Sequence, residues 1–137
     1  MHSKKSFHSV IFFKDDTTMP IPRKLLGEVG RAIYAGEKIP LENRVHVIFC
    51  SDRMIKKLNT QFRGKPYATD VLSFNYDEDD FIGEIYISLQ RAAVQARRYE
   101  VTYNEEIIRL FVHGMIHLQG YDHEKPSDRK RMEAVER

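Results

Sequence analysis

The sequence lacks several features that would place the protein outside the cytoplasm. It contains a single cysteine, Cys50, which excludes an intrachain disulfide and fits a reducing compartment. No apolar run approaches the roughly 18 residues that a membrane-spanning helix needs. The charged N-terminus, residues 1–5, is not followed by the apolar core of a signal peptide. We therefore expect a cytoplasmic protein that makes no membrane contact.

Internal repeats, low-complexity tracts and linkers are also absent, so residues 1–137 are expected to form a single domain. The hydrophobic share of 42% and the charged share of 31% are ordinary for a soluble protein. The net charge of +2 is compatible with an anionic substrate but is too small to identify one.

The hydrophobic pattern predicts an α+β fold. Short stretches rich in β-branched and aromatic residues predict four strands, at residues 7–13, 45–50, 71–74 and 83–88. Apolar residues at helical spacing predict helices at residues 23–36, 53–61, 89–99 and 102–120, and a charged stretch predicts another at 129–137. Expected caps are Ser51 or Asp52, Ser88, and a capping box from Thr102 to Glu105. About five helices would then pack on a small mixed four-stranded sheet whose last two strands are antiparallel.

Three of the six histidines lie within one stretch of eleven residues. His113 and His117 are four residues apart, which places both on one face of a helix. Gly120 can then end the helix in the left-handed conformation, so that His123 follows from a loop. Three imidazoles suit Zn²⁺ and leave a fourth position for water, as in a catalytic site. We predict one zinc ion per chain, bound by His113, His117 and His123.

The spacing of this zincin-like stretch is that of metzincin proteases, but the glutamate that serves them as general base is missing. Gly114 stands in its place, which favours a metal hydrolase other than a peptidase. A mid-helix glycine costs about 1 kcal/mol relative to alanine. This cost suggests that a bulky group at the metal face, or a neighbouring strand, comes close to the backbone there. The simpler alternative is two core histidines and one surface histidine.

Residues 113–123 read H-G-x-x-H-L-x-G-Y-D-H, residues 58–63 and 69–74 read L-N-x-x-F-R and T-D-V-L-S-F, and residues 83–88 read G-E-I-x-I-S. In these blocks and their order the sequence resembles the YbeY family of endoribonucleases. The resemblance covers about residues 44–123 and departs from the family's pattern at residues 64–68.

The resemblance implies a zinc-dependent endonuclease that cleaves single-stranded RNA. It implies a role in maturing the 3′ end of small-subunit ribosomal RNA and in ribosome quality control, with the small subunit or assembly factors as partners. The three histidines match the family's zinc ligands, and Arg63 matches its catalytic arginine. A guanidinium fork suits the charge that develops on phosphoryl oxygens. Without the resemblance, a surface salt bridge would be the simpler role for Arg63.

Two other classes of function remain open from the sequence. One is a metzincin-like zinc hydrolase or peptidase that uses the same three histidines. The other is a non-catalytic ribosome-assembly factor with a structural zinc. A structural site usually has four protein ligands, and Cys50 is the candidate that would rescue this alternative.

Overall fold

In a computed structural model, the structure describes residues 7–122 and 135–136. The strands are β1 (Val10–Lys14), β2 (Arg44–Cys50), β3 (Val71–Glu78), β4 (Phe81–Ser88) and β5 (Val135–Glu136). The helices are α1 (Arg23–Glu37), α2 (Asp52–Arg63), α3 (Leu89–Tyr99) and α4 (Tyr103–Asp122). Among these elements, no helix is both long enough and apolar enough to cross a bilayer.

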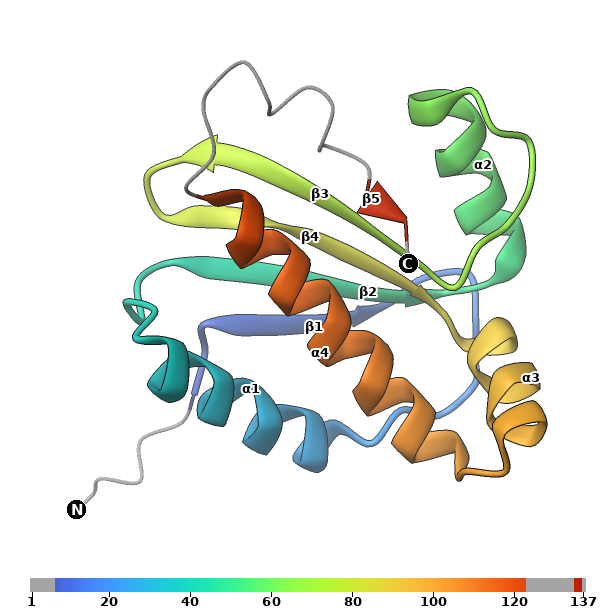
Figure 1. The fold of residues 1–137 in the computed structure, drawn as a ribbon, viewed down its shortest axis with the longest axis horizontal. Coiled ribbons are helices and arrows are strands. Elements are labelled where there is room, and N and C mark those ends of the chain that lie inside the picture. The colour runs from blue at the N-terminus through green and yellow to red at the C-terminus, as the bar shows by residue number, and fades with distance from the viewer. Residues whose placement is uncertain (1–6, 123–134, 137) are drawn as a thin grey trace.

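The strands form one mixed sheet in the order β1-β2-β4-β3-β5 (Figure 1). β1, β2 and β4 are parallel, whereas β3 runs antiparallel to both β4 and β5. All four predicted strands are present, and β3 and β4 form the predicted antiparallel hairpin. The α+β fold is therefore confirmed.

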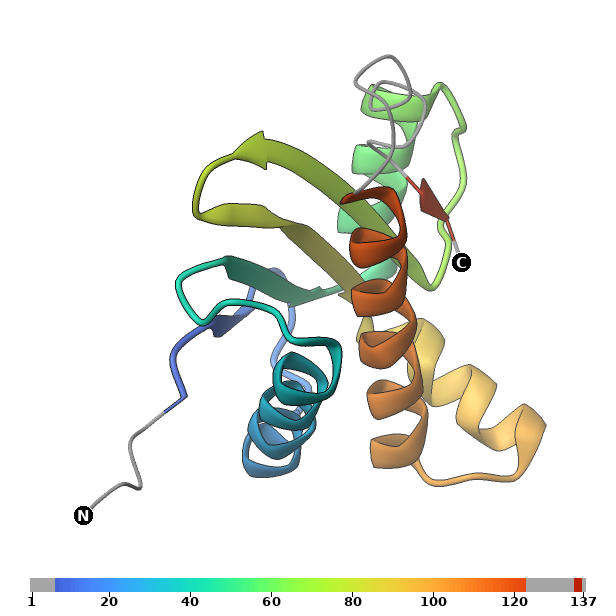
Figure 2. The same cartoon turned by 60° about the vertical axis from the view of Figure 1, so that its left-hand side comes forward.

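The two faces of the sheet carry separate cores. Helices α1, α3 and α4 cover one face, where the main core forms (Figures 1 and 2). Helix α2 packs on the other face over a smaller cluster. Successive residues of a strand point to opposite faces, and so Phe49 lies in the main core whereas Cys50 lies under α2. Helices α2 and α4 thus contact opposite faces of β3.

The helix starts follow the predicted capping residues. The hydroxyls of Ser51 and Ser88 each accept a hydrogen bond from the backbone N–H three residues later, at 3.2 and 3.1 Å. At the start of α4, the Glu105 N–H donates to Thr102 Oγ1 at 3.0 Å, and the Thr102 N–H donates to Glu105 Oε1 at 2.8 Å. This reciprocal pair is the predicted capping box.

Two predictions near the C-terminus are wrong. Helix α4 does not end at Gly120 but continues to Asp122, because glycine permits the left-handed conformation without requiring it. Val135 and Glu136 do not belong to a helix over residues 129–137. They pair as β5 with β3, which offers unpaired backbone groups as an edge strand. The rest of that predicted fifth helix falls outside the described residues.

Glycines allow α4 and the β3–β4 hairpin to approach closely. A Cβ atom on Gly114 would lie 2.7 Å from Ile85 Cγ2, and one on Gly83 would lie 3.0 Å from Leu118 Cδ2. Beside them, the Asn75 side-chain amide donates a buried hydrogen bond of 3.2 Å to the Leu118 carbonyl. Of the two explanations offered for Gly114, the structure supports a neighbouring strand close to the helix backbone.

Candidate functional site

The two helical histidines of the predicted metal site lie together on α4. The ring centroids of His113 and His117 are 4.9 Å apart, with an angle of 34° between the ring planes. Both residues are half-buried. The spacing of four residues therefore brings the two imidazoles to one surface, as predicted.

His123, the third predicted ligand, lies outside the described residues. Among the residues whose side chains the structure describes, no group of three histidine, cysteine or acidic residues could hold a metal ion. A three-ligand site that includes His113 and His117 therefore needs a side chain outside this set, such as the predicted His123. The zincin-like arrangement stays a prediction.

An ion pair precedes the histidines along α4. The Arg109 guanidinium lies 2.6 Å from a carboxylate oxygen of Glu106, whose side chain is 1% exposed. Gln95 of α3 donates to the same carboxylate at 2.6 Å. The hydrogen bond to Glu106 raises the pKa of Arg109, and the carboxylate of Asp70 adds to the effect. A buried carboxylate is stable only when it is paired in this way, and its partners join α3 to the histidine-bearing helix.

Arg63 is the last residue of α2 and is half-buried. Gly64 follows in the left-handed conformation, with φ of 70°, and ends the helix. The fully buried Asn59 donates from its side chain to the Tyr67 carbonyl at 2.9 Å, which fixes the following loop against α2. The structure therefore places Arg63 on a different helix from the two histidines, and β3 lies between the helices (Figure 1).

A groove of about 710 Å³ lies between α2 and the β3–β4 hairpin. This groove was not predicted from the sequence. The sequence does contain a signal for this groove, because side chains alternate between the two faces of each strand. One face of the hairpin lines the groove with Phe74, Tyr76, Glu84 and Tyr86. Which of these side chains are neighbours depends on the strand register, and residue type alone does not reveal that register.

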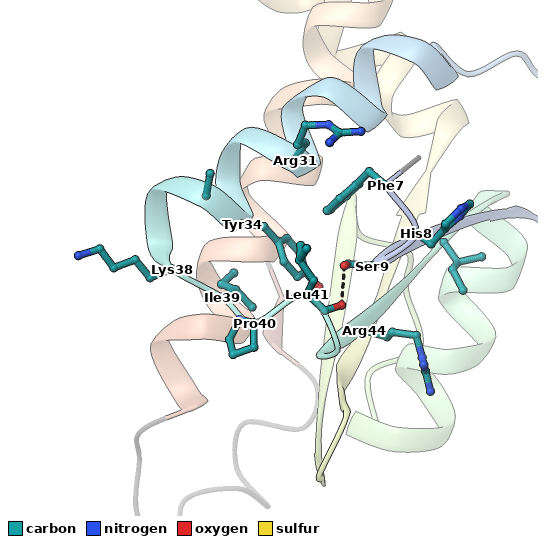
Figure 3. Close-up of a pocket in the computed structure, with 12 residues that line it drawn as sticks. Phe7, His8, Ser9, Arg31, Tyr34, Lys38, Ile39, Pro40, Leu41 and Arg44 are labelled. Carbon is teal, nitrogen blue, oxygen red and sulfur yellow. Dashed lines mark hydrogen bonds between the residues drawn. The ribbon is translucent and has the colours of Figure 1, made fainter. Parts of the chain in front are cut away.

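A second cavity, of about 1080 Å³, lies between the start of β1, the end of α1 and the loop after it (Figure 3). Tyr34 donates to the Asn43 carbonyl at 2.5 Å, and Ser9 donates to the Leu41 carbonyl at 2.6 Å, so its walls are tied together. None of the predicted site residues that the structure describes, Arg63, His113 and His117, lines this cavity.

Comparison with known proteins identifies a family that this chain matches. The family model described as Endoribonuclease YbeY matches residues 12–137. The endoribonuclease YbeY of Chlorobaculum tepidum is 37% identical over 117 residues, which cover 85% of each chain. That of Persephonella marina is 43% identical over 112 residues, which cover 77% of this chain and 72% of the relative.

The fold also resembles a solved structure. The solution structure of a protein from Thermotoga maritima matches with a TM-score of 0.60 and 34% sequence identity. The match covers 90% of this chain and 81% of the other. The family match includes both α2 and α4, the helices that carry Arg63 and the two histidines.

Proposed function

This chain belongs to the YbeY family of endoribonucleases, and we propose that it is a zinc-dependent endoribonuclease that cleaves single-stranded RNA. The observation that carries the proposal is the pair of imidazoles of His113 and His117 on one surface of α4. We also propose ribosomal RNA precursors as the substrate, and maturation of the small-subunit 3′ end and ribosome quality control as the role. The small ribosomal subunit or its assembly factors would then be the partners.

The donor set fits zinc. A zinc–nitrogen bond is about 2 Å long, so two rings whose centroids are 4.9 Å apart can both bind one ion. His123 would complete the set, one ion per chain, and neutral imidazoles are ligands that zinc prefers. When bound there, zinc would supply an activated water at neutral pH.

Arg63 would act on the phosphate rather than on the metal. Its planar guanidinium can donate two parallel hydrogen bonds to phosphoryl oxygens, where negative charge grows during cleavage. The helix that carries Arg63 is capped at Gly64, and Asn59 holds the following loop through the Tyr67 carbonyl. These contacts would help to orient the guanidinium toward a bound phosphate.

Two observations speak against the alternative functions considered from the sequence. A metzincin-like peptidase needs a carboxylate after the first histidine, but the chain has Gly114 there, packed against Ile85. A structural zinc would need a fourth ligand. Cys50 is fully buried under α2, across the sheet from α4, and cannot join the histidines.

The test is cleavage of labelled single-stranded RNA by the zinc-loaded protein, compared with a duplex of the same sequence and with casein. We expect cleavage of the single strand alone, and less cleavage as the salt concentration rises, because phosphate contacts are screened. EDTA and the His117→Ala variant should both abolish it. Cleavage that persists in both controls would come from a contaminating ribonuclease. Cleavage of casein but not of RNA would refute the proposal.

A further inference from the structure

The groove between α2 and the β3–β4 hairpin has aromatic walls. Phe62 comes from α2, Phe74 and Tyr76 come from β3, and Tyr86 comes from β4. The ring centroids of Phe62 and Phe74 are 5.5 Å apart, and those of Phe74 and Tyr86 are 5.7 Å apart, and both pairs pack edge to face. The Phe62 side chain is 58% exposed and the Tyr76 side chain is 38% exposed. The walls therefore include exposed aromatic rings, the kind of side chain on which a planar ligand can stack.

Among the described residues that line the groove, Glu84 carries a carboxylate. Glu84 is half-buried, and the hydroxyls of Tyr76 and Tyr86 donate to its Oε1 at 3.0 and 3.3 Å. Both of these bonds use the same oxygen. Burial, together with the adjacent Glu84 charge, raises the pKa of Tyr86, so its hydroxyl keeps its proton and remains a donor. Among the described residues no hydrogen bond is made to Oε2 of Glu84, which is left as an acceptor for a ligand.

Aromatic walls around a carboxylate acceptor match one part of an RNA strand. Unpaired bases stack on aromatic side chains. Carboxylates accept hydrogen bonds from exocyclic amino groups such as N4 of cytosine, whereas uracil presents the acceptor O4 at the same place. Lys57, the cationic side chain among the described residues that line the groove, can contact a flanking phosphate.

The groove also adjoins the candidate catalytic residue. Gln61 and Phe62 line it, and the next residue of the helix is Arg63. An RNA strand that places a base beside Phe62 therefore has its adjacent phosphates near the end of α2, where Arg63 lies.

We propose that this groove binds one unpaired base of the RNA substrate and that Glu84 selects a base with an exocyclic amino group, cytosine over uracil. The inference rests on the proposed function, because it assigns a base-binding subsite to the same RNA substrate. Glu84 acts here as a specificity residue and takes no part in cleavage.

The experiment measures binding of labelled oligocytidylate and oligouridylate of equal length by fluorescence anisotropy. The protein is kept in EDTA so that binding is separated from cleavage. The wild type should bind oligocytidylate more tightly by on the order of tenfold. In Glu84→Gln the amide can donate to O4 of uracil as well as accept from N4 of cytosine, so the two affinities should become equal.

Two aromatic substitutions locate the site. Phe62→Ala should weaken binding of both oligonucleotides, because stacking does not depend on base identity. Phe13→Ala removes a comparably exposed aromatic ring that does not line the groove, and it should change neither affinity. Far-ultraviolet circular dichroism of each variant confirms that it is folded.

The outcomes separate this inference from the proposed function. Equal binding of the two oligonucleotides by the wild type, or unchanged binding by Phe62→Ala, would overturn the inference. If the zinc-loaded protein still cleaves single-stranded RNA in that case, the proposed function stands. If instead the groove discriminates cytosine from uracil but the protein cleaves no RNA, the inference stands and the nuclease proposal falls.

Discussion

Gly114 of α4 lies directly against Ile85 of β4, so that a Cβ atom on the glycine would be 2.7 Å from Ile85 Cγ2 and 3.0 Å from its Cδ1. The position of the missing side chain thus faces the main core. The glycine lets the helix that carries His113 and His117 pack close to the sheet. Its cost to helix stability is therefore offset by packing, independently of any ligand.

We expect Gly114→Ala to destabilise the fold by about 1–3 kcal/mol, the usual cost of overpacking a core. Gly27→Ala on α1 is the matched control. Its added methyl group meets nothing within 4 Å, so higher helix propensity should stabilise the protein by about 0.5–1 kcal/mol. Denaturant unfolding measures both.

A double-mutant cycle tests whether the contact with Ile85 causes the destabilisation by Gly114→Ala. In an Ile85→Ala background the atoms that Gly114→Ala would strike are gone, so the alanine should cost clearly less there than in the wild type. An equal cost in the two backgrounds would contradict the close contact.

Local chemistry predicted most of the fold. The caps Ser51, Ser88 and Thr102 act through neighbouring backbone groups, and the structure shows each of them. The helix at residues 89–99 has the predicted bounds. In the same way, helical spacing alone was enough to bring His113 and His117 together.

The features that sequence reasoning missed depend on distant contacts. The partner of Gly114 comes from β4, and the groove around Glu84 depends on which residues of β3 and β4 are paired. A glutamate at position 114 would push a charge into Ile85, so Gly114→Glu is expected to destabilise the fold. Helix periodicity does not predict where Arg63 lies relative to the histidines either, because α2 and α4 are positioned by the sheet on whose opposite faces they pack.

Cys50 should be an unreactive thiol in the folded protein. Burial raises its pKa to about 12, and the nearby Asp15, Asp16 and Asp52 add to the shift. Since the thiolate is the reactive form, Ellman's reagent at pH 8 should label the native protein far more slowly than the unfolded chain. Rapid labelling of the native protein would contradict the buried position.

The raised pKa of Cys50 also predicts lower stability at alkaline pH. The unfolded thiol loses its proton near pH 9.0 while the folded one keeps it to about pH 12. The unfolded state thus binds fewer protons in this window, and the free energy of unfolding should fall as the pH rises through it. Burial also raises the pKa of Tyr34 and Tyr86, so the slope attributable to the thiol is the difference between wild type and Cys50→Ala.

We expect the purified protein to contain one zinc ion and His113→Ala or His117→Ala to lose most of it, because three ligands leave little redundancy. Elemental analysis measures the metal. His8→Ala, which removes an exposed histidine outside the candidate site, is the control and should keep its zinc. Full zinc content in His117→Ala would refute the assignment, and full content in His123→Ala would mean that the third ligand lies elsewhere.

Replacing Arg63 should separate catalysis from metal binding. If the guanidinium stabilises charge on the phosphoryl group, Arg63→Ala should keep its zinc and its fold and lose on the order of 10²-fold or more in turnover. Arg63→Lys should recover only part of this loss, because an ammonium group does not reproduce the planar fork.

Arg98→Ala removes the same charge from an exposed position in the last turn of α3 and should cleave normally. Single-turnover cleavage with saturating protein gives the comparison. Unchanged turnover in Arg63→Ala would return the arginine to a surface role, and an equal loss in Arg98→Ala would mean that net charge, rather than a placed guanidinium, controls the rate.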